Sequence, residues 1–255
     1  MNAELASGNF EAMLKIDERG AVAPQIYAAL RQAIITMALK PGQPLSEKEI
    51  AANFGSSRQP AREAVIKLVE AGLVRVLPQR GTYVVKVSPR QVADARFVRE
   101  AVEVAIARHC CLSPDAPALR DLARVIARQE EAAAANDHAG FLALDEAFHK
   151  GLAEAVGCSE AWRVIEMGKA QMDRVRYLSL PEASPMTLLI DQHRDILAAI
   201  RRGDADEAAA AVRVHLREIL LSLPRLAKAF PDLFENEELP GHAADLQPGL
   251  RGIGW

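Results

Sequence analysis

Four residues in the C-terminal half of the chain have side chains that could hold one divalent metal ion together. Asp145 and His149 are four residues apart on the segment Ala139–Val156, whose apolar residues have helical spacing, so both side chains face inward. His193 and His215 lie on two later helical segments, each flanked by apolar residues on its own face. Burying these groups separately is costly, whereas one metal ion satisfies all of them.

The alternative without a metal is that each histidine is a core residue with an ordinary hydrogen-bond partner. Because three histidines and a carboxylate converge, we favour one divalent metal ion per chain, with zinc or nickel ahead of manganese or iron. An open coordination position on such a metal admits an organic acid, or a water for hydrolysis. A hydrolase also needs a general base, and Glu146 points about 100° away from Asp145 on a helix. Sensing therefore ranks above catalysis.

A second group of residues, near the N-terminus, has the types and spacing to read DNA. Ser46 can cap a short helix over residues 47–54, which Gly55 ends. Ser57 then precedes a second helix, Arg58–Glu70. Two helices joined by a short turn with glycine have the geometry that lays the second helix in a major groove.

Two arginines occupy the start of that second helix. Arg58 and Arg62 are four residues apart and share the face opposite the apolar one. An arginine placed there can make two hydrogen bonds to guanine, which is worth about 1–3 kcal/mol of discrimination. The alternative is a solvated helix face, which an isolated arginine pair would favour.

The segment after this helix predicts a β-hairpin. Two short strands, Leu73–Leu77 and Thr82–Val87, are joined by a turn that ends in Arg80-Gly81. The helix pair followed by a hairpin is typical of a winged helix-turn-helix, and the tip residues suit a phosphate or the minor groove. The complete pattern favours DNA binding over the solvated-face alternative.

This arrangement resembles the N-terminal domain of the GntR family of bacterial transcriptional regulators. The matching residues are Leu39-Lys40-Pro41-Gly42, Leu45-Ser46-Glu47, Ser57-Arg58-Gln59-Pro60-Ala61-Arg62-Glu63-Ala64, Gly72-Leu73-Val74 and Gly81-Thr82. Lys48 replaces an arginine and Gln59 a threonine that are usual in the family, which leaves the operator sequence open. The resemblance implies a double-stranded DNA operator. The predicted DNA-binding residues are Lys48, Ser57, Arg58, Gln59, Arg62, Arg80 and Gly81.

The metal-ligand pattern has a family likeness too. The spacing of Asp145, His149, His193 and His215 is similar to that of the metal-binding FCD domain, the helical ligand-sensing module of FadR-type GntR regulators. Arg99 and Glu103 match the arginine–glutamate pattern of its first helix.

The FCD resemblance also implies an effector site. It implies that Arg99, with Glu103, reaches a small carboxylic acid whose oxygens complete the metal's coordination. The alternative is a surface Arg99–Glu103 ion pair, worth a few tenths of a kcal/mol. Arg174 and Arg176 are further candidates.

The remaining sequence predicts a mainly α protein: a winged helix-turn-helix followed by an antiparallel all-α helical bundle. The expected parts are an arm over residues 1–20, a DNA-binding domain over 21–87, an effector-binding and dimerisation bundle over 88–229, and a loose tail over 230–255. Within the DNA-binding domain, Pro24–Met37 predicts a first helix. Breaks in helical periodicity at Ser113–Asp115, Asp137-His138, Gly157, Pro181–Pro185 and Gly203-Asp204 predict about six helices in the bundle.

Composition agrees with a globular regulator. Of 255 residues, 50% are hydrophobic and 25% charged, and no apolar run approaches the roughly 18 residues that would cross a bilayer. The net charge of −3 is divided unevenly, because residues 1–87 carry 11 Lys and Arg against 8 Asp and Glu. The basic excess thus lies in the part expected to meet phosphates. Three cysteines predict reduced thiols in a cytoplasmic protein.

These features together predict a cytoplasmic homodimeric transcription factor, a repressor that a carboxylic acid releases from a pseudo-palindromic operator. One alternative is a constitutive DNA-binding protein whose metal is structural. The other is a metal-dependent hydrolase. The sequence leaves open the effector, the operator and the target genes. It also leaves open the choice between repressor and activator, and whether the effector releases or strengthens DNA binding.

Overall fold

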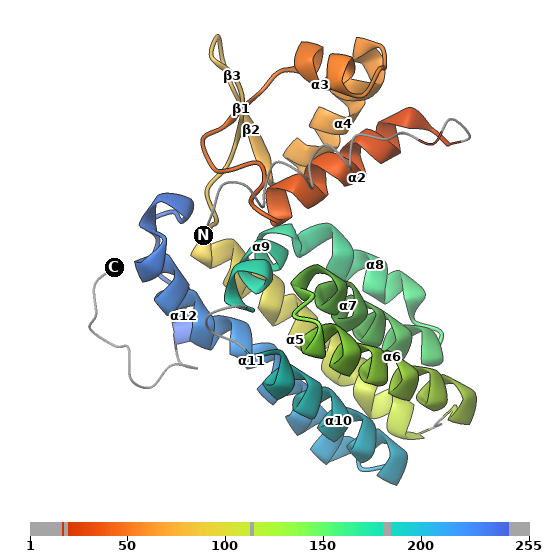
Figure 1. Cartoon of the computed structure of the whole chain (residues 1–255). Helices are drawn as coiled ribbons and strands as arrows, with labels where there is room; N and C mark the ends of the chain where they lie inside the picture. Colours follow the sequence, from red (N-terminus) through yellow and green to blue (C-terminus); the bar gives the residue numbers. More distant parts are fainter. Residues whose placement is uncertain (1–16, 18–19, 113–114, 181–184, 245–255) are drawn as a thin grey trace. The chain divides into compact units, whose positions relative to one another are not determined.

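The computed structural model describes residue 17 and residues 20–112, 115–180 and 185–244, and these fall into two compact units (Figure 1). The first runs to Ser88 and also takes in Phe230–Glu235, and the second contains Pro89–Ala229 and the chain from Asn236. Nearly all of the expected arm and the tail beyond residue 244 lie outside the described residues, as do the predicted breaks at residues 113–114 and 181–184.

Up to Ser88, the described part of the N-terminal unit has three α-helices and a small antiparallel sheet. The helices are α2 (Val22–Ile35), α3 (Glu47–Asn53) and α4 (Arg58–Glu70). The apolar stripe of α2 packs against α4, where Ile26, Leu30, Ala64 and Leu68 are at most 1% exposed. Burial of this stripe holds α4 on the rest of the unit.

The sheet has the strand order β1-β3-β2, from β1 (Pro44–Leu45), β2 (Val74–Leu77) and β3 (Gly81–Val84). β2 and β3 are the predicted hairpin, with Val74 opposite Val84. β1 was not predicted, because two residues are too few to show an alternating pattern. The prediction that the second strand continues to Val87 is wrong, because Val87 instead forms a parallel bridge with Phe234.

That bridge also shows that the prediction of a loose tail is wrong for residues 230–235. The backbone N–H of Val87 donates to the Leu233 oxygen at 2.8 Å, and the N–H of Glu235 donates to the Val87 oxygen at 2.8 Å. Phe234 is buried, so residues 231–235 pack into the first unit. A short 3-10 helix, Pro231–Leu233, precedes the bridge, and α12 (Gly241–Ala244) follows it.

The second unit is a helical bundle. Its helices before residue 230 are α5 (Pro89–Leu112), α6 (Ala116–Ala134), α7 (His138–Ala155), α8 (Ser159–Gly168), α9 (Ala170–Ser179), α10 (Met186–Arg202) and α11 (Ala205–Ala229). The expected count of about six is one short, because the stretch after Gly157 is broken at Lys169. Glycine at position 168 weakens the helix there, and the Lys169 side chain turns inward to Glu146. Figure 1 shows α6 beside α7 and α10 beside α11, as their packing requires.

Local signals fix the ends of these helices. The Asp115 carboxylate accepts a hydrogen bond from Ala118 N at 3.4 Å at the start of α6, and Asp137 accepts one from Gly140 N at 2.9 Å at the start of α7. Gly203, with φ of +72°, ends α10 in the left-handed conformation that glycine adopts without strain. Among the described residues, no helix combines the length and the apolar character that a membrane span requires.

Candidate DNA-reading surface and metal centre

The turn between α3 and α4 presents the second helix of the motif. The Ser46 hydroxyl accepts a hydrogen bond from Glu49 N at 3.4 Å and caps α3, and Gly55, with φ of +59°, turns the chain after it. α4 begins at Arg58, so Pro60 lies in its first turn, where a missing N–H costs no helical hydrogen bond. The sequence prediction placed the cap, the turn and the start of the second helix at these residues.

The predicted DNA-binding residues are exposed. This holds for Lys48, Ser57, Arg58, Gln59, Arg62, Arg80 and Gly81. The opposite face of α4 carries Ala61, Ala64 and Leu68, which are fully buried. Val69, next to Leu68 in the chain, is 39% exposed.

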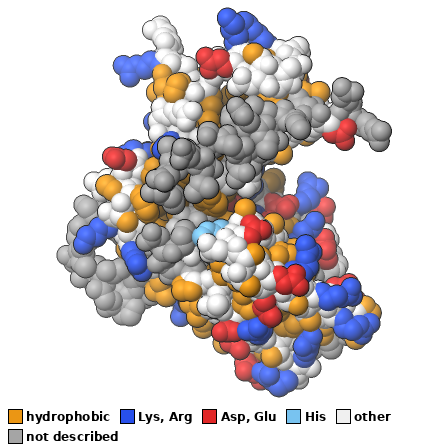
Figure 2. All heavy atoms as spheres, viewed as in Figure 1, with side chains coloured by type: hydrophobic (Ala, Val, Ile, Leu, Met, Phe, Trp, Pro, Cys, Tyr) orange, Lys and Arg blue, Asp and Glu red, His pale blue; other side chains and the backbone are white. Residues whose placement is uncertain are grey.

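The hairpin tip is held by its own strand. The Tyr83 hydroxyl on β3 donates to the backbone oxygen of Arg80 at 2.8 Å, which fixes the backbone of the turn while the Arg80 side chain stays exposed. Figure 2 shows Lys and Arg side chains on this unit, over the helix pair and beside the hairpin. The exposed cations therefore lie on the two elements for which the sequence predicts DNA contacts.

The four predicted metal ligands meet in the middle of the bundle. Asp145 and His149 come from α7, His193 from α10 and His215 from α11, and one ligand atom of each lies within 4.8 Å of the others. All four side chains are buried, with exposed fractions between 0 and 6%. His149 Nε2 and His215 Nε2 are 3.0 Å apart, and His193 Nε2 is 3.6 Å from Asp145 Oδ1.

Each imidazole is oriented through its second nitrogen. His193 Nδ1 lies 2.9 Å from Gln129 Oε1, His215 Nδ1 lies 3.0 Å from Gln192 Oε1, and His149 Nδ1 lies 2.7 Å from Glu103 Oε2. An acceptor on Nδ1 places the proton there and leaves Nε2 with a free lone pair. With this tautomer, the Nε2 atoms of the three rings would be the ones available to a metal.

The electrostatics of the site favour the protonation states that bind metals. Burial lowers the pKa of His193 and of His215 well below the ordinary value, and the neighbouring histidines and arginines lower it further. Both rings are therefore neutral at pH 7. Burial alone would raise the pKa of Glu103, but Arg99 and His149 hold it well below its usual range. Glu103 is an anion behind His149.

The residues fit a divalent cation. His193 Nε2 and Asp145 Oδ1 are fully buried, and neither has a hydrogen-bond partner among the described residues. Buried polar atoms without partners are costly, and both of these face the cluster. Three neutral imidazoles and a carboxylate are a donor set that zinc and similar ions accept.

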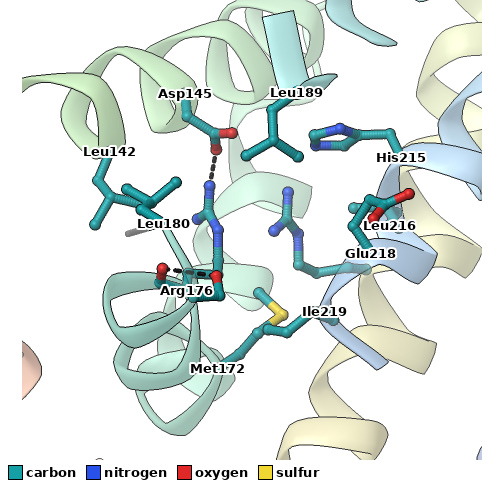
Figure 3. Close-up of a pocket in the computed structure, with 12 residues that line it drawn as sticks. Leu142, Asp145, Met172, Arg176, Leu180, Leu189, His215, Leu216, Glu218 and Ile219 are labelled. Carbon is teal, nitrogen blue, oxygen red and sulfur yellow. Dashed lines mark hydrogen bonds and ion pairs between the residues drawn. The ribbon is translucent and has the colours of Figure 1, made fainter. Parts of the chain in front are cut away.

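A pocket opens beside this cluster, enclosing about 460 Å³ including its opening to solvent. Asp145 and His215 form part of its wall, and Arg99, Arg176 and Glu218 supply its other charged groups. Figure 3 shows Arg176 reaching to Asp145, with His215 and Glu218 across the pocket. The remainder of the lining is mostly apolar: Leu142, Met172, Leu180, Leu189, Leu216 and Ile219.

The Arg99–Glu103 pair is not on the surface, so that alternative is wrong. Arg99 is 3% exposed and Glu103 4%, and Arg99 Nε lies 2.5 Å from Glu103 Oε1. Arg99 lines the pocket, whereas Glu103 lies behind it against His149. Of the further candidates, Arg176 lines the pocket, and Arg174 is fully buried with its Nη1 on Gln171 Oε1 at 3.2 Å.

Sequence reasoning missed Gln129 and Gln192, which orient two of the histidines. A signal was available for Gln129, because it continues the buried stripe of Leu122 and Ile126 at helical spacing. Glu146, considered above as a general base, is paired with Lys169 Nζ at 2.6 Å and is not part of the cluster. Its position gives no support to the hydrolase alternative.

These features define a class: a winged helix-turn-helix joined to a helical bundle with a buried group of candidate metal ligands. A family model described as "Bacterial regulatory proteins, gntR family" matches residues 23–84, and one described as "FCD domain" matches residues 94–218. The chain belongs to the GntR family, in the branch that carries an FCD domain. Its members are transcription regulators rather than enzymes, so this chain is a transcriptional regulator.

Particular relatives agree. The HTH-type transcriptional repressor RspR of Escherichia coli (strain K12) is 40% identical over 213 residues, which cover 84% of this chain and 93% of that protein. The gluconate operon transcriptional repressor of Bacillus subtilis (strain 168) is 26% identical over 180 residues, 69% of this chain and 74% of that protein. The solved structure titled "E. coli McbR/YncC" matches with a TM-score of 0.69 at 20% identity, over 83% of this chain and 99% of that one.

Proposed function

We propose that this protein is a metabolite-responsive repressor that binds its operator as a homodimer and senses a small carboxylic acid at a divalent metal ion. The observation that carries the sensing part is the double role of Asp145 and His215. Both belong to the buried cluster of candidate ligands, and both line the pocket that also contains Arg99. An acid in the pocket can therefore meet a metal and a guanidinium at once.

The DNA-binding part rests on the exposed face of α4 and on the family. RspR and the Bacillus protein are named repressors, so repression is the output we propose here. The basic excess of the N-terminal part is small, and two copies reading two half-sites supply the affinity that one copy lacks. Because the proposed operator lies on the chromosome, we expect the protein to work in the bacterial cytoplasm. Sedimentation should give twice the chain mass of 27.7 kDa.

A thermal-shift screen tests the sensor. Purified, metal-analysed protein is heated with a panel of small carboxylic acids, because a ligand that binds the folded state raises the melting temperature. We expect at least one acid to raise it, and we expect the shift to disappear after chelation and in Asp145→Ala. A shift that survives both treatments would place the acid elsewhere.

A second candidate is a regulator whose metal is only structural. The observation that favours it is the burial of all four ligands, since closed four-ligand sites are typical of structural zinc. The same screen separates the two functions. One metal per chain with no acid that shifts the melting temperature would support the structural metal and remove the sensor.

The buried carboxylate behind His149 gives a further prediction. Glu103→Gln removes the negative acceptor at His149 Nδ1, and outer partners of this kind contribute about 10- to 100-fold to metal affinity. We expect the Zn²⁺ dissociation constant, measured by chelator competition, to rise by that factor. The control is Glu160→Gln on α8, an exposed partner of Arg163, which should leave it unchanged. Equal affinities of the Glu103 variant and the wild type would show that Glu103 does not tune the site.

A further inference from the structure

Arg176 lies between the pocket and the candidate metal centre. It comes from α9, its side chain is 15% exposed, and it is part of the pocket wall. Its Nη2 also makes an ion pair with Asp145 Oδ2. The same guanidinium therefore faces the place where an anion would enter and contacts a candidate metal ligand.

The Asp145 carboxylate divides its two oxygens between these roles. Oδ1 lies 3.6 Å from His193 Nε2 and has no hydrogen-bond partner among the described residues, so it faces the histidine cluster. Oδ2 is paired with Arg176 and also lies 3.7 Å from His149 Nε2. A metal at the cluster and the guanidinium consequently share one carboxylate.

A chain of ion pairs holds Arg176 in this place. Arg176 Nη1 lies 3.7 Å from Asp173 Oδ1, and Lys169 Nζ lies 2.8 Å from Asp173 Oδ2. Lys169 Nζ also lies 2.6 Å from Glu146 Oε2, on the residue that follows Asp145 in α7. Arg176 on α9 and Lys169, the residue before α9, are therefore paired with two adjacent residues of α7.

Resting on the proposed metal site, we propose that Arg176 couples anion binding in the pocket to metal binding at Asp145. The guanidinium pairs with Asp145 Oδ2 and places a positive charge beside the dication, so it weakens metal binding. A carboxylate that pairs with Arg176 offsets this charge and leaves more of Asp145 to the metal. Metal and anion then bind with positive cooperativity, and each raises the affinity of the other by the same factor.

The first test uses Zn²⁺ alone, with its affinity measured by competition with a chromophoric chelator. We expect Arg176→Met to bind Zn²⁺ more tightly than the wild type, by about 5- to 150-fold, the usual range of such coupling. Arg176→Lys retains the charge and should stay within about threefold. Arg108→Met, which breaks the exposed ion pair with Asp206, is the matched control and should change nothing. A residue with only a structural role would weaken the site when removed.

The second test uses acetate as the smallest carboxylate, with chloride at equal ionic strength as reference. Acetate should tighten Zn²⁺ binding by the wild type but not by Arg176→Met, and the variant also corrects for acetate that binds zinc in solution. If Arg176→Met does not fold, the effect of acetate on the Zn²⁺ affinity of the wild type and of Arg176→Lys tests the coupling instead.

The outcomes separate the two proposals. A wild type that binds no divalent metal overturns the proposed function together with the coupling. If the wild type binds Zn²⁺ normally, two results would overturn the coupling alone. One is a Zn²⁺ affinity of Arg176→Met that is equal to or lower than that of the wild type. The other is the absence of any effect of acetate on Zn²⁺ binding by the wild type.

Discussion

Arg58→Ala combined with Arg62→Ala will abolish sequence-specific DNA retention while leaving the protein folded. Both side chains are exposed on the first two turns of α4, and neither supports the core. A guanidinium that hydrogen-bonds a guanine contributes about 1–3 kcal/mol, so loss of two weakens binding by about 30-fold or more. The measurement is a gel-shift titration on duplexes that the wild type has selected from a random library.

A matched control isolates recognition from charge. Arg124→Ala with Arg163→Ala removes the same charge from exposed positions on α6 and α8, outside the N-terminal unit. It should retain the wild-type preference for the selected duplexes. If the α4 variant kept that preference too, the assignment of α4 as the recognition helix would be wrong.

His193→Ala will lose the metal and lower the melting temperature. His193 is completely buried and its Nε2 faces the cluster, so the substitution removes one of the four candidate ligands. A metal present at about 100 times its dissociation constant stabilises the folded state by about 2.7 kcal/mol. For a protein of this size that corresponds to about 5–10 °C. Metal analysis and thermal melts, each with and without chelator, give the result.

The chelator separates loss of metal from loss of packing. The substitution also leaves a cavity and deprives Gln129 of its partner, and this cost remains when no metal is present. Chelation should therefore lower the melting temperature of the wild type and leave that of the variant unchanged. His109→Ala, an exposed histidine on α5, should behave as the wild type. Full metal content in His193→Ala would show that His193 is not a metal ligand and that the assigned site is wrong.

Local sequence signals were sufficient to predict most of the helices and which of their faces are buried. The caps at Ser46, Asp115 and Asp137 act over three residues, so they can be read from the chain alone. Helical spacing was enough to turn Asp145, His149, His193 and His215 inward. It failed where a distant residue decided the outcome, as at Lys169, whose buried pairing with Glu146 breaks one expected helix into two.

The sequence by itself determined the family, the exposed face of α4 and the four residues that could hold a metal. These depend on side-chain type and on spacing within single helices. Only the tertiary structure decided what surrounds that group, because the partners come from different helices. Gln129 lies 64 residues from His193 along the chain, and Arg176 lies 31 residues from Asp145. No periodicity encodes such distances, since helix packing alone brings these atoms together.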